Sequence, residues 1–311
     1  MGRSRVNVAI VGVGYWGGNL LRTFSKLPEV RVTDVCDLDA TRLRALGAEH
    51  PELRLIDDLG ELVGRDDVDA VVIATPPSRH HTMALAALHA GKHVWVEKPL
   101  ALSAAEGLKR LIDEGALGEL YHLSFERLGM GRIRRDSNVW WNSAPHDLSI
   151  LFHLVPRPVV STRLHQHTYL QPGIADMAVC DLELEGGISA HIYLSWLHPE
   201  KTARVTVVGS ERMLTYEGRF EKRGITLYDY AVDPSTTNGR GAAAPILPVS
   251  HFFARRLEIP AAAEPLGLAA AHFVDCVVTG REPLTSGARS LRVVEVLEAA
   301  EHGATQGGRA G

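Results

Sequence analysis

The sequence predicts an α/β protein with a parallel sheet flanked by helices, followed by a second α/β domain built on an open, largely antiparallel sheet. Two observations lead to this fold class. The first hundred residues alternate short apolar strands with helices, an order that produces a parallel sheet with helices on both faces. Beyond residue 118 the predicted strands are longer, and residues 185–187 read as a hairpin turn between two of them.

The first strand and its turn come from an apolar, β-branched run close to the N-terminus that breaks into the pattern G-x-G-x-x-G. Gly12 and Gly14 permit a tight turn and the close approach of a pyrophosphate, and Gly17 lets the following helix pack against the strand. The start of that helix presents unpaired N–H groups to phosphates. We therefore predict a Rossmann dinucleotide-binding turn in which Tyr15 and Trp16 also contact the cofactor.

A second predicted strand, residues 30–36, ends at Asp37, 20 residues beyond Gly17. A carboxylate at this position can accept hydrogen bonds from both hydroxyls of the adenosine ribose, and it repels a 2′-phosphate. The sequence therefore predicts NAD rather than NADP as the cofactor. The alternative is that Asp37 only caps the next turn.

The rest of the first domain continues the alternation. The predicted segments are a helix containing Leu43 and Leu46, a short strand at 55–56, a strand at 68–74, a helix at 78–90, a strand at 93–96 and a helix at 103–114. Ligands bind at the carboxyl ends of parallel strands, so we place Thr75, Pro76 and His80 at the cofactor site.

Composition excludes several classes of partner. Hydrophobic residues make up 45% and charged residues 23%, and the net charge of −4 gives no reason to expect nucleic acid or an anionic membrane as a partner. The three cysteines lie far apart and form neither a disulfide framework nor a metal knuckle, and the histidines lack a matching ligand set. Because we also find no signal-peptide pattern and no apolar run of membrane-spanning length, we predict a cytoplasmic protein without a bound metal.

The second half of the sequence predicts a sheet interrupted by one helix. The strands are expected at 121–128, 159–168, 178–184, 188–197 and 204–208, and the helices at 146–154, 266–279 and 289–302. Residues 233–250 are rich in Pro, Gly, Ser and Thr and are expected to be a loop. We divide the chain into a dinucleotide-binding domain (1–117), a substrate and oligomerisation domain (118–303) and a disordered tail (304–311).

A candidate for catalysis follows the fifth predicted strand, in Glu97-Lys98-Pro99. A Rossmann sheet delivers side chains beside the nicotinamide at this point, so we count Glu97 and Lys98 among the cofactor-site residues. Lys98 would place a cation where a substrate oxygen gains negative charge, and burial can lower its pKa towards the range for proton transfer. The alternative is a surface lysine in a loop.

The glycine-rich turn, Thr75-Pro76-Pro77, the helix with His80-His81 and Glu97-Lys98-Pro99 together resemble the Gfo/Idh/MocA oxidoreductase family over nearly the whole chain. The resemblance implies a Rossmann domain followed by an α/β domain with an open sheet. The family's D-x-x-x-H motif falls on Asn142 to His146 here, which implies that His146 acts in proton transfer. Asn142 stands where many members have Asp, so it could orient the substrate or His146 but could not relay a proton. The alternative for His146 is a structural role at a helix N-terminus.

The form N-x-x-P-H-D-L-S, residues 142–149, resembles the branch that oxidises or reduces the sugar ring of nucleotide sugars, notably dehydrogenases acting on UDP-N-acetylglucosaminuronate at C3. Residues 195–201 and 207–210 are similar to the same branch. Ser149 replaces the second Asp of the family motif.

Four arginines precede the Trp140-Trp141 pair: Arg127, Arg132, Arg134 and Arg135. They either bind the diphosphate or uracil of a nucleotide sugar or form a solvated basic loop.

The chain departs from the family pattern in one stretch. Only 48 positions separate Lys98 from His146, fewer than the family usually has, so a helix–strand unit of ~30 residues is missing. We expect the Rossmann sheet to lose an edge strand, and one wall of the nicotinamide pocket to be open or rebuilt from residues 127–141.

These features together predict an NAD-dependent oxidoreductase that transfers hydride between nicotinamide and a ring carbon of a sugar, with a nucleotide sugar as the first choice. The family's open sheets pair face to face, which implies a homodimer or homotetramer. The alternatives are a keto-sugar reductase of a deoxysugar pathway and a catalytically silent, NAD-binding regulator. Lys98 and His146 favour an enzyme, and the missing unit favours the regulator.

Overall fold

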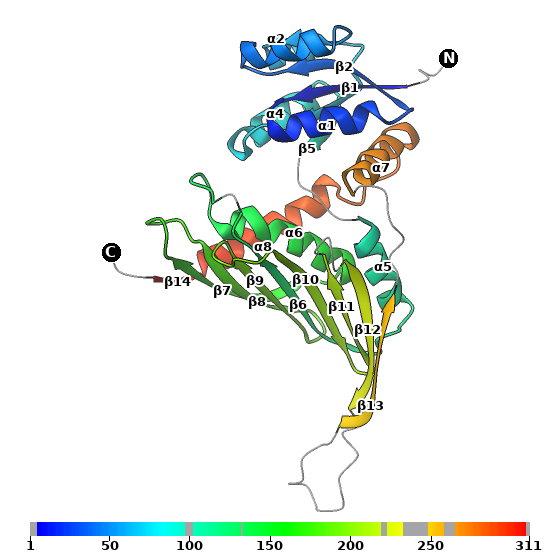
Figure 1. The fold of residues 1–311 in the computed structure, drawn as a ribbon, viewed down its shortest axis with the longest axis vertical. Coiled ribbons are helices and arrows are strands. Elements are labelled where there is room, and N and C mark those ends of the chain that lie inside the picture. The colour runs from blue at the N-terminus through cyan, green and yellow to red at the C-terminus, as the bar shows by residue number, and fades with distance from the viewer. Residues whose placement is uncertain are drawn as a thin grey trace, which may run out of the picture. The chain divides into compact units, whose positions relative to one another are not determined.

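The 311-residue chain is described by a computed structural model over residues 5–96, 102–131, 133–218, 223–232, 248–257 and 265–308. It divides into two compact units, shown in Figure 1. Residues 1–101 and 263–286 form the first, and residues 102–262 and 287–311 form the second. The boundary lies at residue 101 rather than after 117, because the helix at 102–113 packs into the core of the second unit. A helix from the C-terminal part of the chain packs into the first unit.

The first unit is a five-stranded parallel sheet with helices on both faces, as the sequence predicted. Its elements are β1 (Val6–Val11), α1 (Tyr15–Ser25), β2 (Val30–Cys36), α2 (Ala40–Glu49), β3 (Arg54–Ile56), α3 (Leu59–Val63), β4 (Ala70–Ile73), α4 (Pro77–His89), β5 (His93–Val96) and α7 (Pro265–Thr279). The strand order is β3-β2-β1-β4-β5. Among the described residues β5 is an edge strand of this sheet.

The apolar run of β1 is explained by burial on both of its faces. Val8 and Ile10 pack with α1 and α7, whereas Ala9 and Val11 pack with α3 and α4. All four side chains are almost completely buried. A parallel strand covered on both sides has no polar face to keep, which is why the sequence is continuously apolar rather than alternating.

The second unit is a nine-stranded mixed sheet with helices. Its elements are α5 (Leu102–Asp113), β6 (Leu120–Leu128), α6 (Val139–Leu154), β7 (Val159–Thr168), β8 (Met177–Leu184), β9 (Ile188–Ser195), β10 (Thr202–Gly209), β11 (Arg212–Glu217), β12 (Gly224–Val232), β13 (Pro248–Leu257), α8 (Gly287–His302) and β14 (Thr305–Gly308). The strand order is β13-β12-β11-β10-β6-β9-β8-β7-β14. The pairs β6–β9 and β7–β14 are parallel and the other pairs are antiparallel, as expected for a largely antiparallel sheet.

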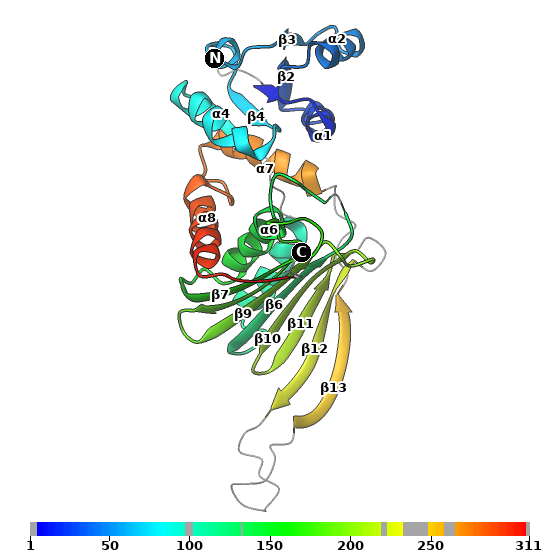
Figure 2. The same ribbon diagram turned by 90° about the vertical axis from the view of Figure 1, so that its left-hand side faces the viewer.

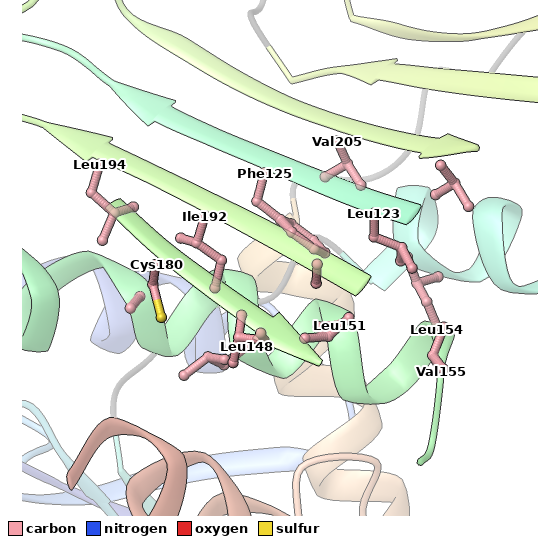
Figure 3. Close-up of a cluster of buried hydrophobic side chains, with 14 of the residues drawn as sticks. Leu123, Phe125, Leu148, Leu151, Leu154, Val155, Cys180, Ile192, Leu194 and Val205 are labelled. Atoms are coloured by element: carbon pink, nitrogen blue, oxygen red, sulfur yellow. The ribbon is translucent and has the colours of Figure 1, made fainter. Parts of the chain in front are cut away.

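Helices α5, α6 and α8 cover one face of this sheet, and no described helix covers the other (Figures 1 and 2). Figure 3 shows the core between them, where Leu148 and Leu151 of α6 meet Phe125 of β6 and Ile192 of β9. The strand β6 lies between β9 and β10 in the middle of the sheet. Helix α6 is therefore held over the centre of the sheet.

Three expectations for this unit need correction. Helix α6 begins at Val139 rather than near residue 146, because the Asn138 side chain caps it by accepting the N–H of Trp141 at 2.9 Å. Residues 305–308 of the expected disordered tail form β14, which pairs with β7. Residues 248–250 of the loop expected at 233–250 belong to β13.

No helix in the part of the chain that the structure describes is long and apolar enough to cross a membrane.

Candidate active site

The glycine-rich turn after β1 combines two tight contacts with one open position. Gly12 has a φ of +87°, a conformation that favours glycine, and a Cβ there would lie 2.9 Å from the Thr75 Cγ2. A Cβ at Gly17 would overlap the carbonyl oxygen of Gly12. A Cβ at Gly14 would meet only an Arg42 guanidinium nitrogen, at 4.0 Å. Two of the glycines therefore serve the packing of the turn, and Gly14 leaves room for a ligand.

The first turn of α1 is suited to bind a phosphate. Gly14 is the N-cap residue and makes no side-chain cap, so the first N–H groups of the helix have no competing side-chain oxygen from this residue. Tyr15 and Trp16 follow with 78% and 53% of their surface exposed, and their rings meet edge to face at 5.9 Å. This arrangement fits the diphosphate of a dinucleotide, with two aromatic rings beside it.

Asp37 is oriented at the carboxyl end of β2 by the backbone. One carboxylate oxygen accepts the N–H of Val13 at 2.8 Å, and the other accepts the N–H of Asp39 at 2.9 Å. Asp37 therefore does cap the following turn, as the alternative interpretation held. Each carboxylate oxygen has further lone pairs, so the same group can still accept a ribose hydroxyl.

Arg42 is a residue of this region that the sequence interpretation missed. Its guanidinium lies 3.8 Å from the Asp37 carboxylate and 3.3 Å from that of Asp39, and its side chain is 54% exposed. Asp39 caps α2 and accepts the N–H groups of Thr41 and Arg42. The N-cap signal of Asp39 places Arg42 in the first turn of α2, one turn away from Asp37, and could have identified it.

The predicted residues after β4 are brought to the same end of the first unit. Thr75 follows β4, and its carbonyl oxygen is 2.7 Å from the Nε2 of His80 in the first turn of α4. Pro76 caps α4. Because β1 and β4 are neighbours at the point where the strand order reverses, the Thr75 segment lies beside the glycine turn, where ligands bind in sheets of this kind.

Glu97 and Lys98 lie outside the described residues. The described part of β5 ends at Val96, which pairs with Ile73 of β4. Val96 and Ile73 therefore finish their strands at the same end of the sheet, and Thr75 follows two residues after Ile73.

In the second unit, Asn142 and His146 both lie on α6 and both are half-buried. Their spacing of four residues places them on the same side of the helix. The Asn142 side chain donates to Ser143 Oγ at 3.3 Å. The two residues of the D-x-x-x-H-like motif are thus neighbours on one helical face.

The arginine cluster is not a single group. Arg127 lies within β6 and donates two hydrogen bonds to the buried carboxylate of Asp147, at 2.7 and 3.1 Å. Burial disfavours the charged guanidinium, but the Asp147 carboxylate outweighs this and raises the pKa of Arg127. Arg134 pairs with Asp136, Arg135 is exposed, and Arg132 lies outside the described residues. For Arg127 the solvated-loop interpretation was wrong, because the residue lies in β6 and is paired with Asp147.

Two acidic residues that position α6 were also missed. Asp147 directly follows His146, and Glu301 of α8 accepts hydrogen bonds from Asn138 Nδ2 at 2.9 Å and Trp141 Nε1 at 2.6 Å. Asp147 could have been noticed as an acid inside an otherwise apolar helical stretch. Glu301 is 160 residues from Trp141 in the chain, and no local signal connects them.

Two other kinds of reactive site find no support. Burial, reinforced by the nearby Asp37 carboxylate, raises the pKa of Cys36 to about 11, so this thiol stays protonated at neutral pH. Within the described ranges, no group of three or more His, Cys, Asp or Glu side chains is arranged to hold a metal ion.

A dinucleotide turn in a Rossmann unit, joined to an α/β unit that carries His146, defines a class of oxidoreductase folds, and comparison with known families agrees. Residues 6–115 match the oxidoreductase family GFO_IDH_MocA with an NAD-binding Rossmann fold, and residues 106–215 match the GFO/IDH/MocA C-terminal domain. The chain belongs to the Gfo/Idh/MocA oxidoreductase family.

Individual relatives are similar over about two fifths of the chain. Glycosyl hydrolase family 109 protein 2 of Shewanella sp. (strain ANA-3) is 37% identical over 136 residues, 41% of this chain and 30% of the relative. Inositol 2-dehydrogenase of Rhodococcus erythropolis is 38% identical over 124 residues, 39% of this chain and 36% of the relative. The chain thus spans about a third of the length of these curated relatives.

A similarity in fold extends over almost the whole chain. The structure of UDP-N-acetylglucosamine 3-dehydrogenase GnnA from Acidithiobacillus ferrooxidans superposes with a TM-score of 0.77, covering 96% of this chain and 98% of that one, at 21% sequence identity. At this identity the similarity establishes the fold alone.

Proposed function

We propose that this protein is an NAD-dependent oxidoreductase that transfers hydride between nicotinamide and a ring carbon of a sugar, with a nucleotide sugar as the first candidate. The observation that carries the proposal is that one chain has both features. Its glycine turn is held by the hydrogen bond from the Val13 N–H to Asp37, and His146 and Asn142 lie on one face of α6. The family of oxidoreductases to which the chain belongs supports hydride transfer. The fold shared with a UDP-N-acetylglucosamine 3-dehydrogenase supports the choice of a nucleotide sugar.

Each candidate residue has a defined task in this reaction. When bound, NAD would accept the hydride that leaves the ring carbon. His146 would take the hydroxyl proton on an imidazole nitrogen and so act as the general base. Lys98 would hold the same oxygen and stabilise the negative charge that develops on it. Asn142 would orient the substrate or the His146 ring.

The direct test is an assay of NAD reduction against a panel of UDP- and TDP-linked sugars, with free inositol and unlinked hexoses as comparison substrates. Turnover of a nucleotide sugar would support the proposal. Oxidation of NADH by a keto-sugar, without measurable NAD reduction by the corresponding sugar, would favour the reductase alternative. Tight NAD binding without turnover of any sugar would favour the silent regulator, with the short stretch between Pro99 and Asn142 as its first explanation.

Asp37→Ala is expected to weaken NAD binding about 10- to 100-fold, because hydrogen bonds to a charged group contribute about 1.5–3 kcal/mol. The same change should relax the preference against NADP, because it removes the charge that repels a 2′-phosphate and releases Arg42 from its ion pair. Fluorescence titration with NADH and NADPH measures both effects. Equal or tighter NADPH binding by the unmodified protein would refute the NAD preference.

Two further variants separate the charge of Asp37 from its role in the turn. Asp37→Asn keeps an oxygen for the Val13 N–H, so it should relax discrimination with a smaller loss of NAD affinity. In the double variant Asp37→Ala/Arg42→Ala, the gain in NADPH binding should be smaller than in Asp37→Ala, because only the loss of the repelling charge remains. A gain of the same size in both variants would show that Arg42 does not contact the 2′-phosphate.

We also propose that the uncovered face of the nine-stranded sheet mediates self-association. Along β9, Ile188, Ala190 and Ile192 are buried under the helices, whereas His191 and Tyr193 lie on the opposite side of the strand. We expect a dimer or tetramer by light scattering at micromolar concentration, and a shift towards monomer in Tyr193→Glu. A monomeric unmodified protein would count against this proposal.

The matched control for association is Val278→Glu. Val278 is 65% exposed on α7 in the other unit, so the same kind of charge is introduced at an apolar surface position far from β9 in the chain. Equal dissociation by both variants would show that the loss of association is not specific to the sheet face.

A further inference from the structure

Helix α6 is weakened next to His146. Pro145 lies inside the helix, directly before His146, and has no N–H to donate to the carbonyl of Trp141. The Ser149 hydroxyl donates to the Pro145 carbonyl at 2.6 Å, a contact that tends to bend helices. The helical hydrogen bonds alone therefore do not fix the turn that presents His146.

The part of α6 before the proline is held by α8. Glu301 accepts hydrogen bonds from both Asn138 and Trp141, as described above, and Trp140 Nε1 donates to the Leu297 carbonyl at 3.1 Å. These contacts anchor the first turn of α6. All three contacts lie before Pro145; beyond it, Leu148 and Leu151 pack against the sheet, and the segment carrying His146 also has a directional anchor of its own.

That anchor is the ion pair between Arg127 and Asp147. Arg127 extends from β6, in the middle of the sheet, and binds both carboxylate oxygens of Asp147, whose side chain is 3% exposed. A bidentate pair constrains both the distance and the orientation of the two groups. The segment after the proline is thereby tied to the central strand.

The surroundings make a charged pair an unexpected choice for stability alone. Leu148, Leu151 and Phe125 form an apolar core beside this part of α6 (Figure 3). The Asp147 side chain is 3% exposed and that of Arg127 32%. An apolar pair of similar size would give comparable stability, because the Asp147 carboxylate and much of the Arg127 side chain must be removed from water to form the ion pair. What the ion pair adds over an apolar contact is a defined orientation.

We propose that Arg127 is a positioning residue that acts through Asp147 to set the direction of His146. Successive residues of an α-helix point about 100° apart, so turning Asp147 towards the sheet determines where the neighbouring imidazole points. The Arg127–Asp147 pair fixes the rotation of α6 about its axis after Pro145. Glu301 fixes the part of the helix before Pro145. The inference rests on the proposed function only for its activity measurement.

The test is the double variant Arg127→Met/Asp147→Leu, which replaces the ion pair by apolar side chains. We expect its melting temperature and NAD affinity to stay close to those of the unmodified protein, and the NMR signal of the His146 ring, assigned with His146→Asn, to shift. On a confirmed substrate, kcat should fall roughly 10²-fold with little change in KM, as for a misplaced catalytic group. An unchanged His146 signal in the folded variant would overturn the proposal, whether or not a substrate is known.

A matched control removes a similar pair elsewhere. Arg54 binds both oxygens of the fully buried Asp34 at 2.8 Å in the first unit, so Arg54→Met/Asp34→Leu should leave the His146 signal unchanged. A shift of that signal in the control would overturn the assignment to the Arg127–Asp147 pair. If the test variant does not fold, the Arg127→Lys variant tests the role of Arg127 instead, because lysine keeps the charge but cannot form the bidentate contact. A folded Arg127→Lys protein should shift the His146 signal, and an unchanged signal would refute the role of Arg127.

Discussion

His146→Asn is expected to lower turnover roughly 10²- to 10⁴-fold, because it removes the group proposed to accept the hydroxyl proton. Lys98→Met keeps the length of the side chain but removes its charge and donors, and is expected to cost roughly 10²- to 10³-fold, the usual effect of losing one donor to a developing oxyanion. Both variants should bind NAD normally, since neither changes the glycine turn. Steady-state kinetics on the substrate found in the panel assay, with NADH titration alongside, measures both quantities.

The control for this prediction lies on the same helix. His153, two turns further along α6, faces Glu106 of α5 at 3.4 Å, so His153→Asn repeats the substitution away from the motif. We expect it to keep near-normal turnover. Near-normal turnover in both His146→Asn and Lys98→Met would show that the catalytic assignment is wrong. Loss in all three variants would indicate that α6 is disturbed rather than that a base has been removed.

The first unit could be predicted closely because its signals are local. The apolar run of β1, the glycine turn and Asp37 all lie within a short stretch, and the structure adds only distances to them. Helix α3 was missed because it is a single short turn capped by Asp58, with too few residues to show helical periodicity. The place of α7 was missed for a different reason, since its packing against α1 and β1 joins segments far apart in the chain.

In the second unit, local rules conflicted with tertiary packing. Pro145 argues for a helix boundary, so the start of α6 was placed near residue 146, although Asn138 caps the helix a full two turns earlier. The strands β11, β12 and β13 were missed despite alternating apolar positions such as Leu214, Ile225 and Leu227. Only the pairing of these strands in the sheet makes that alternation meaningful.

The same contrast applies to the candidate site. Asn142 and His146 could be singled out from the motif they match, but the helix was expected to begin only near residue 146, so their common helical face came from the structure. The roles of Arg127 and Glu301 could not, because each depends on a partner brought close by the sheet or by α8. Sequence reasoning therefore located the residues proposed to react, and the structure was needed to find the residues that orient them.

Gly17→Ala is expected to abolish measurable NAD binding and to destabilise the first unit by about 1–3 kcal/mol or more, the usual cost of forcing extra atoms into a packed site. The added Cβ would overlap the Gly12 carbonyl oxygen and lie 2.8 Å from the Gly12 carbonyl carbon, so the clash is with backbone that cannot rotate away. To relieve it, α1 must move off β1, and the N–H groups of its first turn move with it. Thermal unfolding and NADH titration measure the two effects.

The neighbouring glycine supplies the control. Gly18 lies in the same helix turn, and a Cβ there would meet nothing within 4 Å. Gly18→Ala should therefore keep NAD affinity and stabilise the unit by about 0.4–1 kcal/mol, because alanine loses less backbone freedom on folding than glycine. If Gly17→Ala lowers the stability and Gly18→Ala raises it, the close approach of Gly17 to Gly12, rather than helix propensity, controls the geometry of the cofactor turn. Normal NAD binding by Gly17→Ala would mean that the turn tolerates a wider separation of α1 from β1, and that its geometry does not limit cofactor binding.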